Sequence, residues 1–275
     1  MDSNGKLWPH PVKVGPSDQR REQVTGDTVE LWWLEVDSVA AADWPRLEAL
    51  LDDAERARAR RFHFDRDRLS YTAAHALARG LLSAWAGGEP SAWRFTTGPH
   101  GKPEVLAPAT APRLRVNLSH THGLAAAVVT EEHDVGIDVE WLDRRPASGD
   151  LARRFFAPAE CALLEAFPPA LADEAFLSIW TLKEAYIKAI GKGLAQPLDS
   201  FAFSLDPLAI RFEPGAEDDA ADWLFRQFRP TPRHLMALAL RHPQSDEVTI
   251  TASAVNAERL CRQPEATGPG RISLR

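Results

Sequence analysis

The segment from residue 180 to 188, Trp-Thr-Leu-Lys-Glu-Ala-Tyr-Ile-Lys, constrains the fold and the chemistry of this 275-residue chain more than any other. On an α-helix, Trp180, Glu184 and Lys188 stand at i, i+4 and i+8 and therefore share one face. This face places a carboxylate beside an ammonium group. The simpler alternative is a solvent-exposed ion pair, which would stabilise the helix by only ~0.2–0.5 kcal/mol.

A second segment, Val-Gly-Ile-Asp-Val-Glu at residues 135–140, alternates apolar and acidic residues. In a strand, Asp138 and Glu140 project together from the face opposite the apolar residues, and two like charges roughly 7 Å apart favour a bound cation. Glu184 would add a third carboxylate to a site suited to Mg²⁺, which is commonly also bound by water and phosphate oxygens. The pattern predicts a magnesium site and phosphate chemistry, and the alternative is a hairpin with a solvent-facing acidic side.

Composition limits the classes of partner. The chain is 44% apolar and 26% charged, and it contains no apolar run near the ~20 residues that a membrane helix needs and no apolar signal core at its start. The net charge of −7 argues against bulk binding of nucleic acid. Cys161 and Cys261 provide no disulfide framework, which fits a reducing cytoplasm. We therefore expect a cytoplasmic protein that binds neither membrane nor nucleic acid.

Apolar periodicity and turn residues predict an α+β pattern in both halves of the chain. The predicted helices cover residues 44–60, 66–86, 158–167 and 172–191. The predicted strands cover residues 29–36, 93–96, 113–118, 124–130, 135–141, 200–205, 209–213, 223–229, 234–241 and 247–253. The polar ends, residues 1–27 and 256–275, are expected to be flexible.

Two upstream segments carry further polar chemistry. The loop at 97–102 is punctuated by Gly and Pro and ends in Lys102, so it can bring backbone amides and an ammonium group to a phosphate. In Asn117-Leu-Ser-His120, Ser119 and His120 resemble a nucleophile and base, but neighbours on a strand point to opposite faces. His120 and His122 would form half of a zinc site, yet no third ligand at a typical spacing is evident beyond His133.

Together these segments resemble the Sfp-type 4′-phosphopantetheinyl transferases of the holo-acyl-carrier-protein synthase superfamily. The matching motifs, in the family's order, are GKP (101–103), NLSH (117–120), GIDVE (136–140) and WTLKEAYIK (180–188), with further similar segments at 60–68, 153–160 and 191–201. The resemblance covers roughly residues 28–255. It implies two similar α+β halves produced by pseudo-duplication, at 28–130 and 131–255, with the active site and coenzyme A in the cleft between them.

The resemblance also implies roles for individual residues. Asp138, Glu140 and Glu184 bind Mg²⁺, and Lys188 holds a phosphate oxygen and assists proton movement. Glu160 matches a position proposed as the base or its support, and its alternative is an acid that stabilises the start of a helix. The residues expected to contact coenzyme A are Arg58, Arg68, Lys102, Asn117, Ser119, His120 and Lys183. Arg58 is the best candidate for its 3′-phosphate, although Glu55 and Arg58 stand where the family often carries lysines.

The implied reaction moves the 4′-phosphopantetheine arm of coenzyme A to a serine of an apo acyl or peptidyl carrier protein and releases adenosine 3′,5′-bisphosphate. Two alternatives use the same residues: a Mg²⁺-dependent phosphohydrolase, and a noncatalytic module that binds coenzyme A or the carrier. The carrier served and the base, Glu184 or Glu160, stay open at this stage. Pseudo-duplication makes a monomer the expected state.

Overall fold

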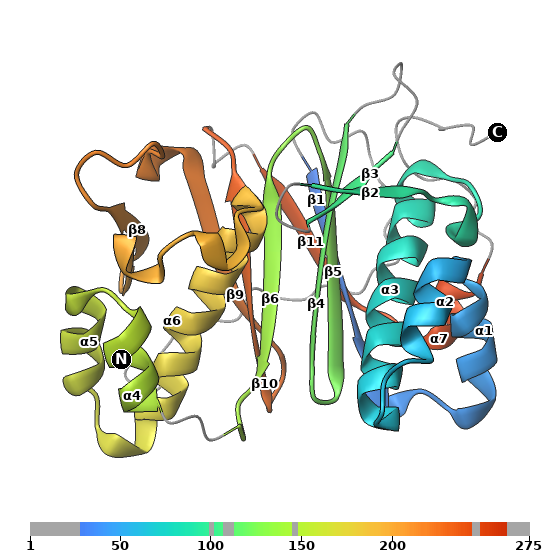
Figure 1. Cartoon of the computed structure of the whole chain (residues 1–275), viewed down its shortest axis with the longest axis horizontal. Helices are drawn as coiled ribbons and strands as arrows, with labels where there is room; N and C mark the ends of the chain where they lie inside the picture. The colour runs from blue at the N-terminus through green and yellow to red at the C-terminus, as the bar shows by residue number, and fades with distance from the viewer. Residues whose placement is uncertain (1–27, 99–101, 107–112, 145–147, 244–247, 263–275) are drawn as a thin grey trace.

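The computed structural model describes residues 28–98, 102–106, 113–144, 148–243 and 248–262 (Figure 1). Its strands form two main sheets, ordered β11-β1-β5-β4 and β6-β10-β9, and two small hairpins, β2-β3 and β7-β8. A helix of 22 residues packs on each main sheet, α3 on the first and α6 on the second. The predicted α+β class with two similar halves is confirmed.

The elements follow the chain in two comparable series. The first series is β1 (Thr28–Glu35), α1 (Trp44–Ala49), α2 (Asp53–Ala59), α3 (Asp65–Ala86), β2 (Phe95–Thr97), β3 (Pro103–Val105), β4 (Leu114–Thr121) and β5 (Leu124–Glu131). The second series is β6 (Val135–Trp141), α4 (Ser148–Phe155), α5 (Pro158–Glu165), α6 (Pro169–Ile190), β7 (Phe201–Leu205), β8 (Leu208–Phe212), β9 (Trp223–Thr231) and β10 (His234–Arg241). The chain then continues through β11 (Thr249–Ala254) and α7 (Ala257–Leu260).

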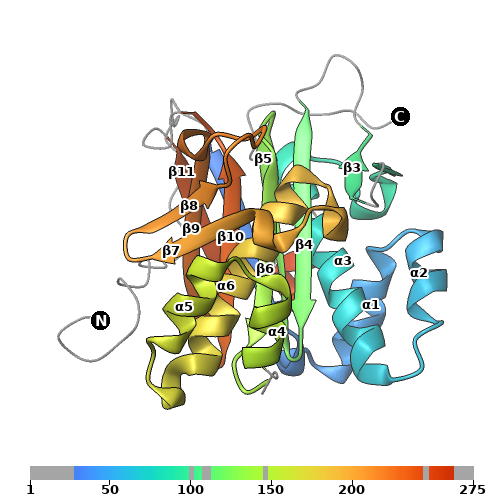
Figure 2. The ribbon, with the colours of Figure 1, turned by 60° about the vertical axis from the view of Figure 1, so that its left-hand side comes forward.

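The layers are helix, sheet, sheet and helix (Figure 1). Both faces of β1 are buried: Trp32 and Leu34 contribute to the core under α3, whereas Leu31 and Trp33 contribute to the core between the two sheets. A third core lies between the second sheet and α6. Figure 2 shows the hairpin β7-β8 and helices α4, α5 and α6 in front of the second sheet.

Besides shifts of one to three residues at their ends, the helices differ from the predicted ones in two respects. The helix expected at 44–60 is two helices, because Asp52 caps the start of α2: its side chain accepts from the Glu55 backbone N–H, and the Glu55 carboxylate accepts from the Asp52 N–H. The helix α4 was not predicted. It is only eight residues long, which is shorter than the window of about 11–18 residues over which apolar periodicity indicates a helix.

The end of the chain packs on the first half, although the expected division places residues 131–255 in the second half and 256–275 in a flexible tail. β11 pairs in parallel with β1, from Thr28 opposite Thr249 to Trp33 opposite Ala254. After it, Ala257 and Leu260 of α7 are buried in the core under α3. The described part of the expected tail is therefore packed, and residues 263–275 lie outside the described residues.

The two halves meet where β4 and β6 run side by side, each at one end of its own sheet (Figure 1). Side chains of β4 reach the backbone of β6: Asn117 Oδ1 accepts from the Ile137 N–H at 2.9 Å, and Ser119 Oγ accepts from the Val139 N–H at 3.3 Å. We call this junction the seam. Within the described ranges, none of the helices is both long and apolar enough to cross a bilayer.

Candidate active site at the seam

Gly136 lets helix α6 lie directly against strand β6. A Cβ built on Gly136 would stand 2.5 Å from the Ala189 backbone nitrogen and even closer to the Ala185 carbonyl oxygen, so only glycine permits this approach. Glu184 and Lys188 precede these two contact residues by one position each. The helix therefore carries both side chains to the face of β6 that bears Gly136, Asp138 and Glu140.

The predicted strand at 135–141 and the orientation of its acidic residues are confirmed. Val135, Ile137 and Val139 are buried in the core between the sheets. Asp138 stands opposite Ala237, which belongs to the core under α6. Asp138 and Glu140 are themselves nearly buried, with exposed fractions of 6% and 8%.

Asp138 is the centre of the site. Its Oδ1 accepts from Lys188 Nζ at 2.6 Å and from Ser119 Oγ at 2.9 Å. Lys188 Nζ also donates to Ser119 Oγ at 3.0 Å and to the Ile137 carbonyl at 3.2 Å. The other oxygen, Asp138 Oδ2, is buried without a hydrogen-bond partner in the described structure. A buried carboxylate oxygen in this state is free to accept a cation.

Glu140 and Glu184 flank this centre. Arg144 Nη1 contacts both carboxylate oxygens of Glu140, at 3.0 and 3.2 Å. Glu184 has no hydrogen-bond or ion-pair partner among the residues that the structure describes, and it is half-buried. Neither carboxylate lies on a fully exposed surface, so the solvent-facing alternatives do not describe them.

Burial and mutual repulsion shift the acidity of these groups. Burial raises the pKa of Glu184 to about 7, and the negative charges of Asp138 and Glu140 add to the effect, against the opposing charge of Lys188. Burial and then Asp138 also raise the pKa of Glu140, although Arg144 opposes them. The site thus concentrates negative charge in a poorly solvated place.

Asn117 and Ser119 are buried in the seam, where their contacts are with β6 and Lys188. His120, the next residue, is exposed, as expected for neighbours that point to opposite faces of a strand. Although part of its surface is exposed, the protein atoms around its ring desolvate it, and this effect and then the charges of Lys188 and His75 lower the pKa of His120. Since His75 belongs to α3 and Lys188 to α6, His120 lies where both halves influence it.

Glu160 and Lys183 are not part of this cluster, contrary to the roles expected for them. Both side chains are fully buried and form an ion pair at 2.8 Å. Lys183 Nζ also donates to the carbonyls of Leu198 and Phe201, at 2.6 and 2.7 Å. Glu160 accepts from the backbone N–H groups of Ala157 and Phe203. This pair ties α5, α6 and β7 together inside the second half, where both side chains are closed to solvent.

The basic residues expected at coenzyme A have different surroundings. Arg58 is exposed, and its guanidinium lies 5.6 Å from the centre of the Tyr71 ring; among the described residues it has no carboxylate at ion-pair distance. Arg68 is paired with Glu48 at 3.0 Å and with Asp65 at 3.2 Å. Arg58 therefore remains the more available of the two for a phosphate.

Lys102 lies where β6 begins and α6 ends. Its Nζ donates to the Ala189 carbonyl at 2.7 Å and to the Val135 carbonyl at 3.3 Å. Residues 99–101 of the predicted phosphate loop lie outside the described residues. The ammonium group of Lys102 is thus engaged by backbone oxygens of α6 and β6.

Two residues that matter to the site were not singled out from the sequence. Gly136 had a signal, because a glycine inside an apolar strand commonly marks a close backbone approach. Arg144 had none, since nothing in the sequence shows that it folds back on Glu140.

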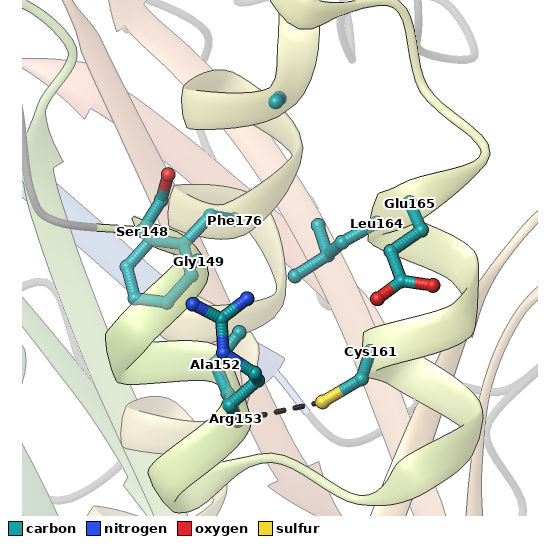
Figure 3. A pocket seen from close by; sticks show the side chains of 9 residues that line it. Ser148, Gly149, Ala152, Arg153, Cys161, Leu164, Glu165 and Phe176 are labelled. Atoms are coloured by element: carbon teal, nitrogen blue, oxygen red, sulfur yellow. Dashed lines mark hydrogen bonds between the residues drawn. The ribbon is translucent and has the colours of Figure 1, made fainter.

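A pocket of ≈ 120 Å³ between α4, α5 and α6 is lined by Ala152, Cys161 and Phe176 among others (Figure 3). It contains none of the seam residues, and we do not include it in the site.

Two family models together match most of the chain. Residues 134–239 match the 4′-phosphopantetheinyl transferase superfamily, and residues 38–133 match the N-terminal region of 4′-phosphopantetheinyl transferases. The boundary between them falls in the turn between β5 and β6.

Curated relatives cover both halves. The chain is 35% identical over 216 residues to the 4′-phosphopantetheinyl transferase HetI of Nostoc sp., covering 78% of this chain and 88% of the relative. It is 28% identical over 205 residues to the 4′-phosphopantetheinyl transferase Sfp of Bacillus subtilis, covering 74% and 87%. It is also 28% identical over 222 residues to the human L-aminoadipate-semialdehyde dehydrogenase-phosphopantetheinyl transferase, covering 74% and 71%.

Proposed function

Since the chain belongs to the 4′-phosphopantetheinyl transferase superfamily and transfers 4′-phosphopantetheine to carrier proteins, we propose that it takes this arm from coenzyme A with Mg²⁺ as cofactor. The acceptor is the serine hydroxyl of an apo acyl or peptidyl carrier protein, and the second product is adenosine 3′,5′-bisphosphate. The observation that carries the proposal is Asp138, whose buried Oδ2 has no hydrogen-bond partner among the described residues while Lys188 holds its Oδ1.

The chemical type of the ligand atoms suits Mg²⁺. Asp138, Glu140 and Glu184 offer only carboxylate oxygens, the ligands that Mg²⁺ prefers, and the charge of Asp138 is close enough to raise the pKa of both Glu140 and Glu184. In the described ranges no three His, Cys, Asp or Glu side chains already form a metal-binding group, so these carboxylates must adjust their side-chain rotamers to bind one ion. A Mg²⁺ ion held by these carboxylates would supply positive charge that stabilises phosphate oxygens.

The chain's own residues supply the remaining functions. Ser119 donates to Asp138 and so fixes the orientation of that carboxylate. Lys188, whose ammonium group lies 2.6 Å from Asp138 Oδ1, is placed to hold a phosphate oxygen beside it. Glu184 is the proton acceptor for the incoming hydroxyl, because its carboxylate has no hydrogen-bond or ion-pair partner among the described residues, whereas Glu160 is fully buried in an ion pair.

The test is intact-mass analysis of several apo carrier domains incubated with coenzyme A and Mg²⁺. We expect the mass of one phosphopantetheine arm to be added, and chelation of Mg²⁺ to stop the addition. Asp138→Ala and Glu184→Ala should each lower kcat/KM by at least about 10²-fold, whereas Glu213→Ala, at an exposed glutamate after β8, should not change it.

Two outcomes would contradict the proposal. Normal turnover of Asp138→Ala in the presence of a chelator would exclude the carboxylate site. Cleavage of coenzyme A without any carrier protein would instead favour the phosphohydrolase, which uses the same carboxylates to activate water.

A further inference from the structure

A lysine from another part of the chain, Lys102, contacts the C-terminal end of helix α6. Its last residue is Ile190, and Gly191 follows in the left-handed conformation, with φ of 69°. The last carbonyl groups of a helix lack partners within the helix and attract cations. Lys102 Nζ meets this need at the Ala189 carbonyl, 2.7 Å away.

The same ammonium group also binds the start of strand β6. It donates to the Val135 carbonyl at 3.3 Å, so one side chain connects the end of α6 to the first residue of β6. The lysine stem is enclosed as well: a Cβ on Gly191 would lie 3.2 Å from Lys102 Cδ. Burial lowers the pKa of Lys102 to about 8, although the charge of Asp134 opposes this effect.

These contacts lie directly beside the catalytic residues. Ala189 follows Lys188, and Val135 precedes Gly136, the residue against which α6 packs. A shift of the last turn of α6 relative to β6 would change the distance between Lys188 and Asp138, which is 2.6 Å. Lys102 connects α6 to β6 at this end of the helix, through the Ala189 and Val135 carbonyls.

We propose that Lys102 is a positioning residue that fixes the end of α6 against the start of β6 and thereby holds Lys188 and Glu184 in register with Asp138. This replaces the expectation, drawn from the sequence, that Lys102 binds a phosphate of coenzyme A. The proposal rests on the transferase function proposed above, and the two roles differ in the kinetic constant that they affect.

The experiment compares Lys102→Met, which keeps the stem but removes the donor, with Lys102→Arg, which keeps a cationic donor. For Lys102→Met we expect kcat to fall about 10- to 100-fold, as for a small misplacement of reacting groups, while KM for coenzyme A and its affinity by calorimetry stay near the wild-type values. Lys102→Arg should recover most of kcat. Lys192→Met is the matched control, because Lys192 is exposed just beyond the same helix end and should leave both constants unchanged.

A raised KM and weakened coenzyme A binding with kcat preserved would overturn the proposal and restore the phosphate role. Unchanged constants in Lys102→Met would also overturn it. If Lys102→Met does not fold, Lys102→Arg decides: a kcat below wild type at unchanged KM supports positioning, and a raised KM contradicts it. An inactive wild-type protein with every carrier tested would mark a failure of the proposed function instead.

Discussion

At the scale of single residues, the three carboxylates of the site differ in the groups that offset their negative charge. Lys188 and Ser119 hold one oxygen of Asp138, and Arg144 holds Glu140. Glu184 has no such partner within the described structure, and burial, together with the charge of Asp138, raises its pKa to about 7. It is therefore the group whose protonation should respond most to a bound cation.

From this pKa we predict that the affinity for Mg²⁺ rises with pH. Below pH 7 the carboxyl group of Glu184 is mostly protonated, and it must lose its proton to bind the ion, so affinity should increase about tenfold between pH 6 and pH 8. Calorimetric titration with Mg²⁺ in buffers of different ionisation enthalpy measures both the affinity and the released proton. Glu184→Gln should remove the pH dependence, and an affinity that stays constant with pH in the wild type would show that Glu184 is not a ligand.

At the scale of elements, the site depends on the approach of α6 to β6. Gly136→Ala would introduce a methyl group into backbone atoms of Ala185 and Ala189, which cannot move as a flexible side chain could. We expect the free energy of unfolding to fall by at least about 1–3 kcal/mol. We also expect kcat to fall, because a displaced α6 would carry Glu184 and Lys188 away from Asp138. Denaturant unfolding and steady-state kinetics measure the two effects.

The matched control for this substitution is Gly149→Ala in α4. There the nearest atom to the new methyl group is Arg153 Nη1 at 3.6 Å, an ordinary contact with a flexible side chain. We expect no loss of stability or activity. If Gly136→Ala behaved like this control, the close packing of α6 on β6 would not be what positions the site.

The sequence predicted these elements well where periodicity alone decides them. The strand at 135–141 and the acidic face of that strand were predicted correctly, because alternation of apolar and acidic residues is a local signal. The partners of Glu160 and Lys183 were not, since a motif does not reveal that two charged side chains are fully buried against each other. Such pairing depends on how α5, α6 and β7 pack in three dimensions.

At the scale of the whole molecule, the two halves are not simply consecutive. β11 follows the second half in the chain but pairs with β1 of the first half, and α7 then packs against α3. No local pattern could predict this return, because a strand's partner is determined by the topology of the entire sheet. The first half, which carries Asn117, Ser119 and His120, is therefore completed only after the second half has been synthesised.

This dependence can be tested at Leu260, in the last described helix. The side chain is 3% exposed, and a Cβ on Gly80 of α3 would lie only 2.9 Å from its Cδ2, so α7 and α3 are in close contact. Leu260→Ala should therefore cost about 2–5 kcal/mol of unfolding free energy, the range for a buried leucine, and lower the Tm. The same substitution at Leu106, which is 53% exposed, is the control and should have little effect. If both variants unfolded like the wild type, the packing of α7 on α3 would not contribute to the stability of the first half, and only the pairing of β11 with β1 would join the end of the chain to it.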